Sequence, residues 1–219
     1  MRSLPASHLL SVWEAARDRL WVERALMVLA AAHPELPTDT LALLPIGERD
    51  SWLLTLREQM FGPTLTSLST CPACDKVLEQ TFSVEDIRVP AAGPARTLLS
   101  LPVDGGTVQF RLPNSHDLAA IARLDDVGVA RTRIVERCLV APYPDGVHPG
   151  RLPERTVSAI AARMAQADPQ GDIQLALCCP YCAHEWLESF DIVSFLWSEL
   201  MAWASRMLDQ VHRLASTYE

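Results

Sequence analysis

The stretch CPYCAHEWLESFDI, residues 179–192, decides how this sequence is interpreted. It opens with Cys-Pro-Tyr-Cys, a motif that serves either as a thiol redox centre or as half of a metal site. A shift of 108 residues places it on CPACDKVLEQTFSV, residues 71–84. The cysteine pairs then coincide, and so do later apolar positions such as Phe82 and Phe190. The sequence therefore predicts the same strand–turn–strand unit twice, each time with Cys-Pro-x-Cys in the turn.

Two Cys-x-x-Cys turns supply the ligands of a tetrahedral zinc site, namely Cys71, Cys74, Cys179 and Cys182. Two residues between thiolates let a tight turn aim both sulfurs at one ion, about 2.3 Å away. Four sulfurs leave no coordination position for water, so we expect the Zn²⁺ ion to be structural rather than catalytic. Because 104 residues separate Cys74 from Cys179, the metal would join two distant hairpins, and its binding energy would contribute to folding.

A dithiol oxidoreductase is the alternative interpretation of Cys-Pro-Tyr-Cys. That chemistry needs the first cysteine at a helix N-terminus, where the helix dipole lowers the thiol pKa. Residues 183–190, AHEWLESF, instead alternate as a strand does. A third interpretation, two unrelated buried cysteine pairs, is disfavoured by the repeat. The metal site is the interpretation that we favour.

Other residues near these motifs are expected to be structural. Cys178 should point to the face of its strand opposite Cys179 and be buried, as a bystander to the metal. Cys138 is expected to be a small core residue, and His184 a solvent-facing histidine of a strand. Asp125 and Asp126 form a carboxylate pair that we expect at a solvated helix end.

Composition excludes several functions. The 219 residues carry a formal net charge of −8 and one lysine, Lys76, so a nucleic-acid-binding role is not expected. No apolar run is long enough for a membrane helix, and no signal-peptide core precedes Glu14, Arg17 and Asp18, so we expect a cytoplasmic protein. The sequence has no phosphate-binding glycine loop, nucleophile elbow or dinucleotide fingerprint, and we expect no enzymatic activity.

The predicted fold class is α+β: a single, mostly helical domain over residues 1–219 with a split zinc ribbon and one further hairpin. Residues 64–85 and 172–191 would form the two halves of the ribbon, and residues 86–171 an insertion between them. The further hairpin is expected at 98–112, turning at the Asp-Gly-Gly of residues 104–106. Helices are expected over residues 7–32, 47–63, 113–124, 129–140, 153–167 and 192–217.

The C-terminal helix carries a broad apolar surface. Leu196, Leu200, Trp203, Met207, Val211 and Leu214 form one stripe, and Trp197, Met201, Ala204 and Leu208 form a second beside it. A helix in the centre of a core has such a surface. The alternative is that part of this face, formed by Trp197, Met201, Trp203 and Met207, contacts a hydrophobic partner.

Several segments resemble a known family: LLPIGERDSWLLTLREQMFGP (43–63), VQFRLPNSHDLAAIA (108–122), both cysteine turns and residues 179–219. They are similar to the zinc-ribbon-bearing relatives of the phage baseplate hub assembly chaperone family, which occur with contractile phage-tail-like injection systems. One difference is Asp75, where the first turn usually has glycine, so this residue would need either a left-handed conformation or an adjusted turn.

The resemblance implies a non-enzymatic, chaperone-like assembly factor whose partner is a baseplate or hub protein of a phage-tail-like particle. A permanent minor structural adaptor of the baseplate is the alternative that we weigh against it. A zinc-ribbon regulator that binds nucleic acid is disfavoured by the acidic charge.

Overall fold

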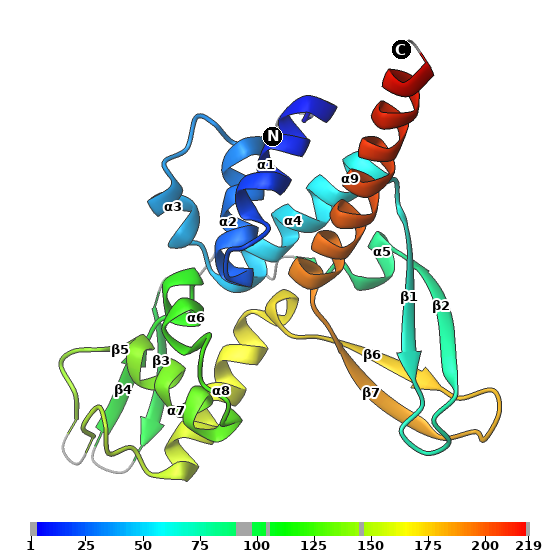
Figure 1. The fold of residues 1–219 in the computed structure, drawn as a ribbon. Coiled ribbons are helices and arrows are strands. Elements are labelled where there is room, and N and C mark those ends of the chain that lie inside the picture. Colours follow the sequence, from blue (N-terminus) through cyan, green and yellow to red (C-terminus); the bar gives the residue numbers. More distant parts are fainter. Residues whose placement is uncertain (1–3, 91–97, 104–105, 145–146, 218–219) are drawn as a thin grey trace.

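The chain folds as a helical body from which two hairpins extend, with a smaller unit of strands and helices beside the body (Figure 1). A computed structural model describes residues 4–90, 98–103, 106–144 and 147–217. The helices are α1 (Ala6–Ala16), α2 (Trp21–Ala32), α3 (Thr38–Ala42), α4 (Ile46–Phe61), α5 (Val84–Ile87), α6 (Ser115–Ile121), α7 (Val127–Cys138), α8 (Glu154–Ala167) and α9 (Ile192–Thr217), with a 3-10 turn η1 (Pro169–Gly171). The strands are β1 (Thr64–Thr70), β2 (Val77–Ser83), β3 (Leu99–Val103), β4 (Gly106–Phe110), β5 (Leu139–Val140), β6 (Ile173–Cys178) and β7 (Glu185–Phe190). The predicted α+β class is confirmed.

The main core lies among α1, α2, α4 and α9. Its apolar side chains recur at helical spacing, so each helix turns one face toward the others. The hairpins β1–β2 and β6–β7 are anchored on the same core at their bases. Leu65 is a buried member of the core, and Phe82, Leu175 and Phe190 pack against it. The position of each hairpin base is therefore set by the helical body.

The sequence predicts one helix over residues 7–32, and this prediction is wrong, because residues 17–20 separate α1 from α2. Two side chains satisfy the helix ends at this break. Glu23 accepts a hydrogen bond from the Leu20 amide (3.1 Å). The Arg24 guanidinium donates to the carbonyl of Ala16, the last residue of α1, at 3.3 Å and to that of Arg17, its C-cap, at 2.8 Å. Helix ends leave such groups unpaired, and these side chains replace the missing partners.

The segment between the hairpins has a core of its own, to which Val108, Phe110 and Ile160 contribute buried side chains. β3 and β4 pair antiparallel, as the sequence predicts, and β5 adds a third strand beside β4. Residues 104 and 105 of the predicted turn lie outside the described residues. The helices expected at 113–124, 129–140 and 153–167 correspond to α6, α7 and α8.

Arg57 occupies a core position of α4 and is only 2% exposed. Its guanidinium donates to both carboxylate oxygens of Glu199 on α9, at 2.6 and 2.8 Å. It also donates to the carbonyls of Gly62 (2.7 Å) and Thr64 (2.6 Å), where α4 ends and β1 begins. A buried guanidinium is tolerated when its N–H groups are paired in this way. Arg57 thus holds α4, β1 and α9 in one arrangement.

The expected C-terminal helix is α9, and its two halves differ in their surroundings. Asp191 caps it by accepting a hydrogen bond from the Val193 amide (3.0 Å). Trp197 is buried beneath the Arg24 guanidinium, 4.6 Å from the ring centre, so it belongs to the core and not to a partner surface. Residues 205–217, here called the distal half of α9, extend past the other helices (Figure 1). Among the residues described, no helix is long and apolar enough to cross a membrane.

We expect Arg57→Leu to lower the free energy of unfolding by about 3–5 kcal/mol, because it leaves Glu199 and two carbonyls without their partner. Urea unfolding of the purified chain measures this loss. Arg131→Leu is the matched control, since it breaks an ion pair with Glu154 whose side chains are 44% and 76% exposed. Such a surface pair contributes less than about 1 kcal/mol. Equal losses in the two variants would contradict the role assigned to Arg57.

Candidate metal centre

The two Cys-Pro-x-Cys turns lie at the tips of the hairpins β1–β2 and β6–β7 and have the same backbone structure. In the first, the Cys71 amide donates to the Lys76 carbonyl at 2.9 Å. In the second, the Cys179 amide donates to the His184 carbonyl at 2.9 Å. Each first cysteine also accepts, through its carbonyl, a bond from the amide four residues later. The sequence repeat is thus a repeat of hydrogen bonding.

Each turn also contains one left-handed residue after its second cysteine. Asp75 has φ 58° and Ala183, its equivalent in the repeat, has φ 57°. Of the two expected alternatives, Asp75 therefore adopts the left-handed conformation and the turn is not adjusted. Aspartate tolerates this conformation, whereas a residue such as alanine loses roughly 1–2 kcal/mol in it. Both turns keep this geometry because it brings two thiols to one side of the hairpin tip.

The four predicted cysteines come together between the tips, with every sulfur within 4.8 Å of every other. The Cys71 and Cys182 sulfurs are 3.7 Å apart, and the Cys74 and Cys179 sulfurs 3.6 Å. A tetrahedron of sulfurs about 2.3 Å from a central ion has edges of about 3.8 Å. A disulfide would need about 2.05 Å. The spacing therefore fits a metal held by four thiolates, and the four cysteines that lie close together are those predicted as ligands.

Backbone amides favour thiolate character in this cluster. Burial opposes ionisation of Cys179, but the amides of Tyr181 and Cys182 outweigh it and lower the pKa of its thiol to about 7. The His184 amide acts to lower the pKa of Cys182, but burial and the neighbouring thiols raise it to about 12. Four thiols this close cannot all ionise without a cation among them. A divalent ion would supply that charge and bind all four as thiolates.

Residues that are equivalent in the repeat contact each other across the cluster. Leu78 and its equivalent Trp186 pack with the cysteines in a small apolar cluster at the tips. At the hairpin bases, Phe82 and its equivalent Phe190 meet edge to face, with ring centres 5.7 Å apart. The first cysteine of each turn lies nearest the second cysteine of the other. The two hairpins therefore face each other as similar halves.

The neighbouring residues differ in part from expectation. Cys178 is exposed, and the prediction that it is buried is wrong: the outer face of β6, with Gln174, Ala176 and Cys178, is exposed throughout. The prediction that Cys178 and Cys179 point to opposite faces does hold, because Cys178 is exposed and Cys179 is buried. His184 is exposed, as predicted, and its ring stacks near that of Trp186, with centroids 6.1 Å apart.

The thiol-redox interpretation is not supported by the local structure. Cys179 is followed by the second strand of a hairpin and not by a helix, so it has no helix dipole to activate it. Its sulfur lies against Cys74 of the other hairpin, 3.6 Å away. The arrangement is that of a closed ligand set.

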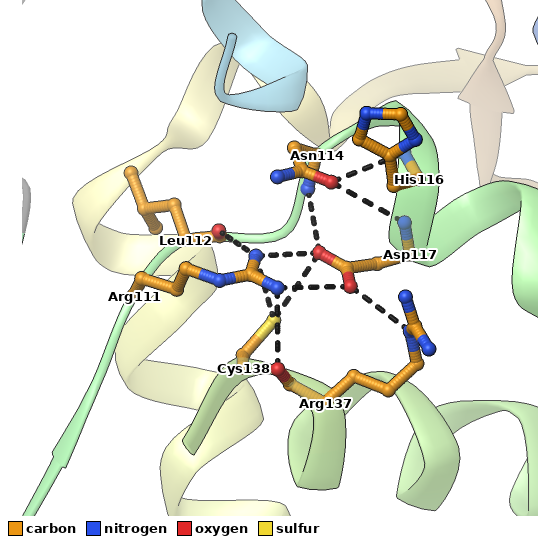
Figure 2. A network of polar contacts seen from close by, with 7 residues as sticks. All are labelled: Arg111, Leu112, Asn114, His116, Asp117, Arg137 and Cys138. Atoms are coloured by element: carbon orange, nitrogen blue, oxygen red, sulfur yellow. Dashed lines mark hydrogen bonds and ion pairs between the residues drawn. The ribbon is translucent and has the colours of Figure 1, made fainter. Parts of the chain in front are cut away.

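A second polar cluster surrounds Asp117, which is fully buried (Figure 2). Its carboxylate accepts from both terminal nitrogens of Arg111 (2.5 and 3.0 Å) and from Nε of Arg137 (3.0 Å). Asn114 contributes its backbone amide, at 3.1 Å, and caps α6 through its side chain. Burial raises the pKa of Asp117, but these partners outweigh it and hold the pKa below its usual value.

This Asp117 cluster is a structural junction and not a reactive centre. Cys138 is buried, as predicted, and its sulfur lies 3.7 Å from the Asp117 carboxylate. Burial and that carboxylate raise the pKa of the thiol to about 12, so it stays protonated at neutral pH. The nearby pair Asp125 and Asp126 is exposed, and Asp126 caps α7 by accepting from the Val129 amide (2.9 Å). Sequence periodicity contained no signal for the pairing of Arg111 and Asp117, because Arg111 lies in the connection between β4 and α6, outside any regular element.

We expect the purified chain to carry a divalent metal ion and Cys71→Ser or Cys182→Ser to lose it, since each removes a thiolate ligand. Elemental mass spectrometry measures the metal content per chain. Cys178→Ser is the matched control, because Cys178 is next to Cys179 in sequence but outside the cluster. Metal loss in Cys178→Ser, or full retention in Cys71→Ser, would contradict this assignment.

Comparison of the chain with protein-family models, with curated proteins and with solved structures finds no match. The metal centre is therefore assigned from the residues and geometry given above.

Proposed function

We propose that this chain is a non-enzymatic assembly factor for the baseplate or hub of a contractile phage-tail-like injection system, with a structural zinc ribbon. The observation that carries the proposal is an apolar helix face displayed on a scaffold that the four-cysteine cluster closes. The setting, a baseplate or hub, comes from the sequence resemblance. An assembly factor needs a rigid frame and an exposed surface for a partner, and the chain supplies both.

Zinc is the metal that this ligand set favours. Four thiolates at tetrahedral spacing are typical of structural zinc, although iron also accepts four sulfurs. When bound, the ion would supply binding energy that stabilises the fold, because it joins segments 105 positions apart in sequence. The two similar hairpins around it support our interpretation of them as the halves of a zinc ribbon.

The exposed face lies on the distal half of α9. Met207, Leu208, Val211 and Leu214 follow helical spacing and continue the stripe by which α9 packs on the core. Leu208, Val211 and Leu214 are 47%, 55% and 60% exposed. A stripe that continues beyond its own core is suited to another apolar surface. The partner would therefore contact this distal stripe and Met201, and not the buried Trp197.

A permanent baseplate adaptor would use the same face, so particle composition separates the two roles. We expect the tagged chain, expressed in cells that assemble these particles, to form cross-links from the distal half of α9 to a baseplate or hub subunit. We also expect mass spectrometry of mature particles to lack the chain. A fixed copy number in mature particles would instead establish the adaptor. Normal particle assembly in cells that lack the chain would overturn both roles.

The double variant Val211→Glu, Leu214→Glu should prevent particle assembly while the chain keeps its metal and its helix content, since it places charge in the apolar stripe. The matched control is Ser205→Glu, Ser216→Glu, which adds the same charge on the opposite face, at 100° per residue. Particle counts by electron microscopy give the readout. Equal particle numbers in the two double variants would exclude the distal stripe as the partner surface.

A further inference from the structure

A groove of about 640 Å³ lies between the two hairpins, apart from the distal half of α9. We call it the inter-hairpin groove. Its walls include residues 66–68 of β1 and 188–190 of β7, and α9 lines it with Ser194, Phe195 and Ser198. The groove exists because the hairpins meet at their tips and bases but not between. The tips meet at the cysteines, and the bases meet at Phe82 and Phe190.

Polar side chains line the middle of the groove, halfway between the tips and the bases of the hairpins, where apolar residues would let the two inner faces pack together. Gln80 and Glu188 are equivalent in the repeat, and both line the groove. Ser67 lies opposite Gln80 in the ladder and also lines it. The adjoining apolar surface is provided by Leu68, Leu175, Phe190 and Phe195. The groove thus combines a polar middle with apolar neighbours.

The free edge of β1 faces this groove. Two hydrogen bonds show which residues of β1 are bonded to β2. The Cys71 amide donates to the Lys76 carbonyl, and the Val84 amide donates to the Pro63 carbonyl. Odd-numbered residues of β1 therefore bond to β2, and the N–H and C=O groups of Thr66 and Leu68 point away from it.

The carbonyl of Thr64, which like those of Thr66 and Leu68 points away from β2, accepts a hydrogen bond from Arg57. Within the described part of the chain, the backbone groups of Thr66 and Leu68 have no such partner. Three consecutive residues of β1 line the groove, as expected where a strand presents its edge and not one face. The edge of β1 therefore offers the unpaired N–H and C=O groups of two residues to an incoming strand.

The charges that line the groove are all negative. They belong to Glu188, Asp191 and Glu199, and the described lining includes no lysine or arginine. Arg57 neutralises Glu199, at 2.6 Å, and Asp191 is occupied as the cap of α9. Glu188 accepts a bond from the Trp186 indole (3.1 Å), which leaves its charge uncompensated. A cationic side chain is the complement that this carboxylate lacks.

We propose that the inter-hairpin groove binds an extended segment of a partner polypeptide, which adds to the edge of β1 as a third strand and places a lysine or arginine beside Glu188. The main-chain bonds to Thr66 and Leu68 give affinity, and Glu188 with the apolar wall gives side-chain preference. This surface is separate from the distal stripe of α9, so it extends the proposed function without depending on it.

The test uses the metal-loaded full chain and fluorescein-labelled heptapeptides of alternating valine and threonine. One peptide has a central lysine, the second a central glutamate, and the third the lysine with N-methylated alternate amides. Fluorescence anisotropy should show binding of the lysine peptide and at least about tenfold weaker binding of the other two. Equal affinity of the lysine and glutamate peptides, or unchanged affinity after N-methylation, would overturn the proposal. So would the lack of any binding up to about 1 mM.

Two variants locate the site. Glu188→Gln should weaken binding of the lysine peptide about tenfold. Glu185→Gln should leave the affinity unchanged, because Glu185 carries the same charge on the same strand outside the groove. Ala202→Trp fills one end of the groove from the exposed surface of α9 and should abolish binding. Metal content and circular dichroism must match those of the parent chain. Equal effects of the two glutamate variants, or undiminished binding by Ala202→Trp, would place the peptide elsewhere and overturn the proposal.

Discussion

The meeting of four thiols between two hairpin tips is the contact on which the rest of this structure depends. A two-stranded hairpin is marginally stable in water by itself, and each of these hairpins is a separate two-stranded sheet. Among the described residues, the apolar cluster at the tips consists of the cysteines with Leu78 and Trp186. So small an apolar cluster cannot hold two hairpin tips together against their conformational entropy. A metal held by Cys71, Cys74, Cys179 and Cys182, whose sulfurs are placed to bind one, would provide what the apolar contacts lack.

The sequence predicted this centre because all of its information is local. Cysteine spacing, the alternation of the flanking strands and the offset between the repeats can each be read from short segments, and each corresponds to an element of the structure. The break between α1 and α2 could not be found in that way, since the apolar period continues through it. The features that identify the break, Glu23 and Arg24, act through the hydrogen bonds that they make. Periodicity cannot distinguish a capping arginine from a surface one.

Buried ion pairs were missed for a related reason. Arg57 and Glu199 are 142 positions apart, and neither is unusual in its own segment. Arg57 follows Leu53 and Leu54 on the buried side of α4, and the available signal was an arginine at a position with the spacing of these apolar residues. Asp117 similarly gathers Arg111 and Arg137 from flanking elements (Figure 2). Both clusters lie where separate elements meet, distant in sequence for Arg57 and adjacent for Asp117, and there a paired charge fixes one geometry, because any other arrangement leaves it unpaired.

The metal centre also bears on the direction of α9. β7 ends at Phe190, Asp191 follows, and α9 begins at Ile192. No flexible linker intervenes, because Asp191 bonds to both the Val193 amide and the Ser194 hydroxyl. The angle between the β6–β7 hairpin and α9 is therefore fixed at the hairpin tip by the cysteines and at its base by Phe190, while α9 itself is held by its packing in the main core. Both proposed surfaces, the inter-hairpin groove and the distal stripe of α9, depend on that angle. A structural metal can in this way organise binding surfaces without contacting any partner itself.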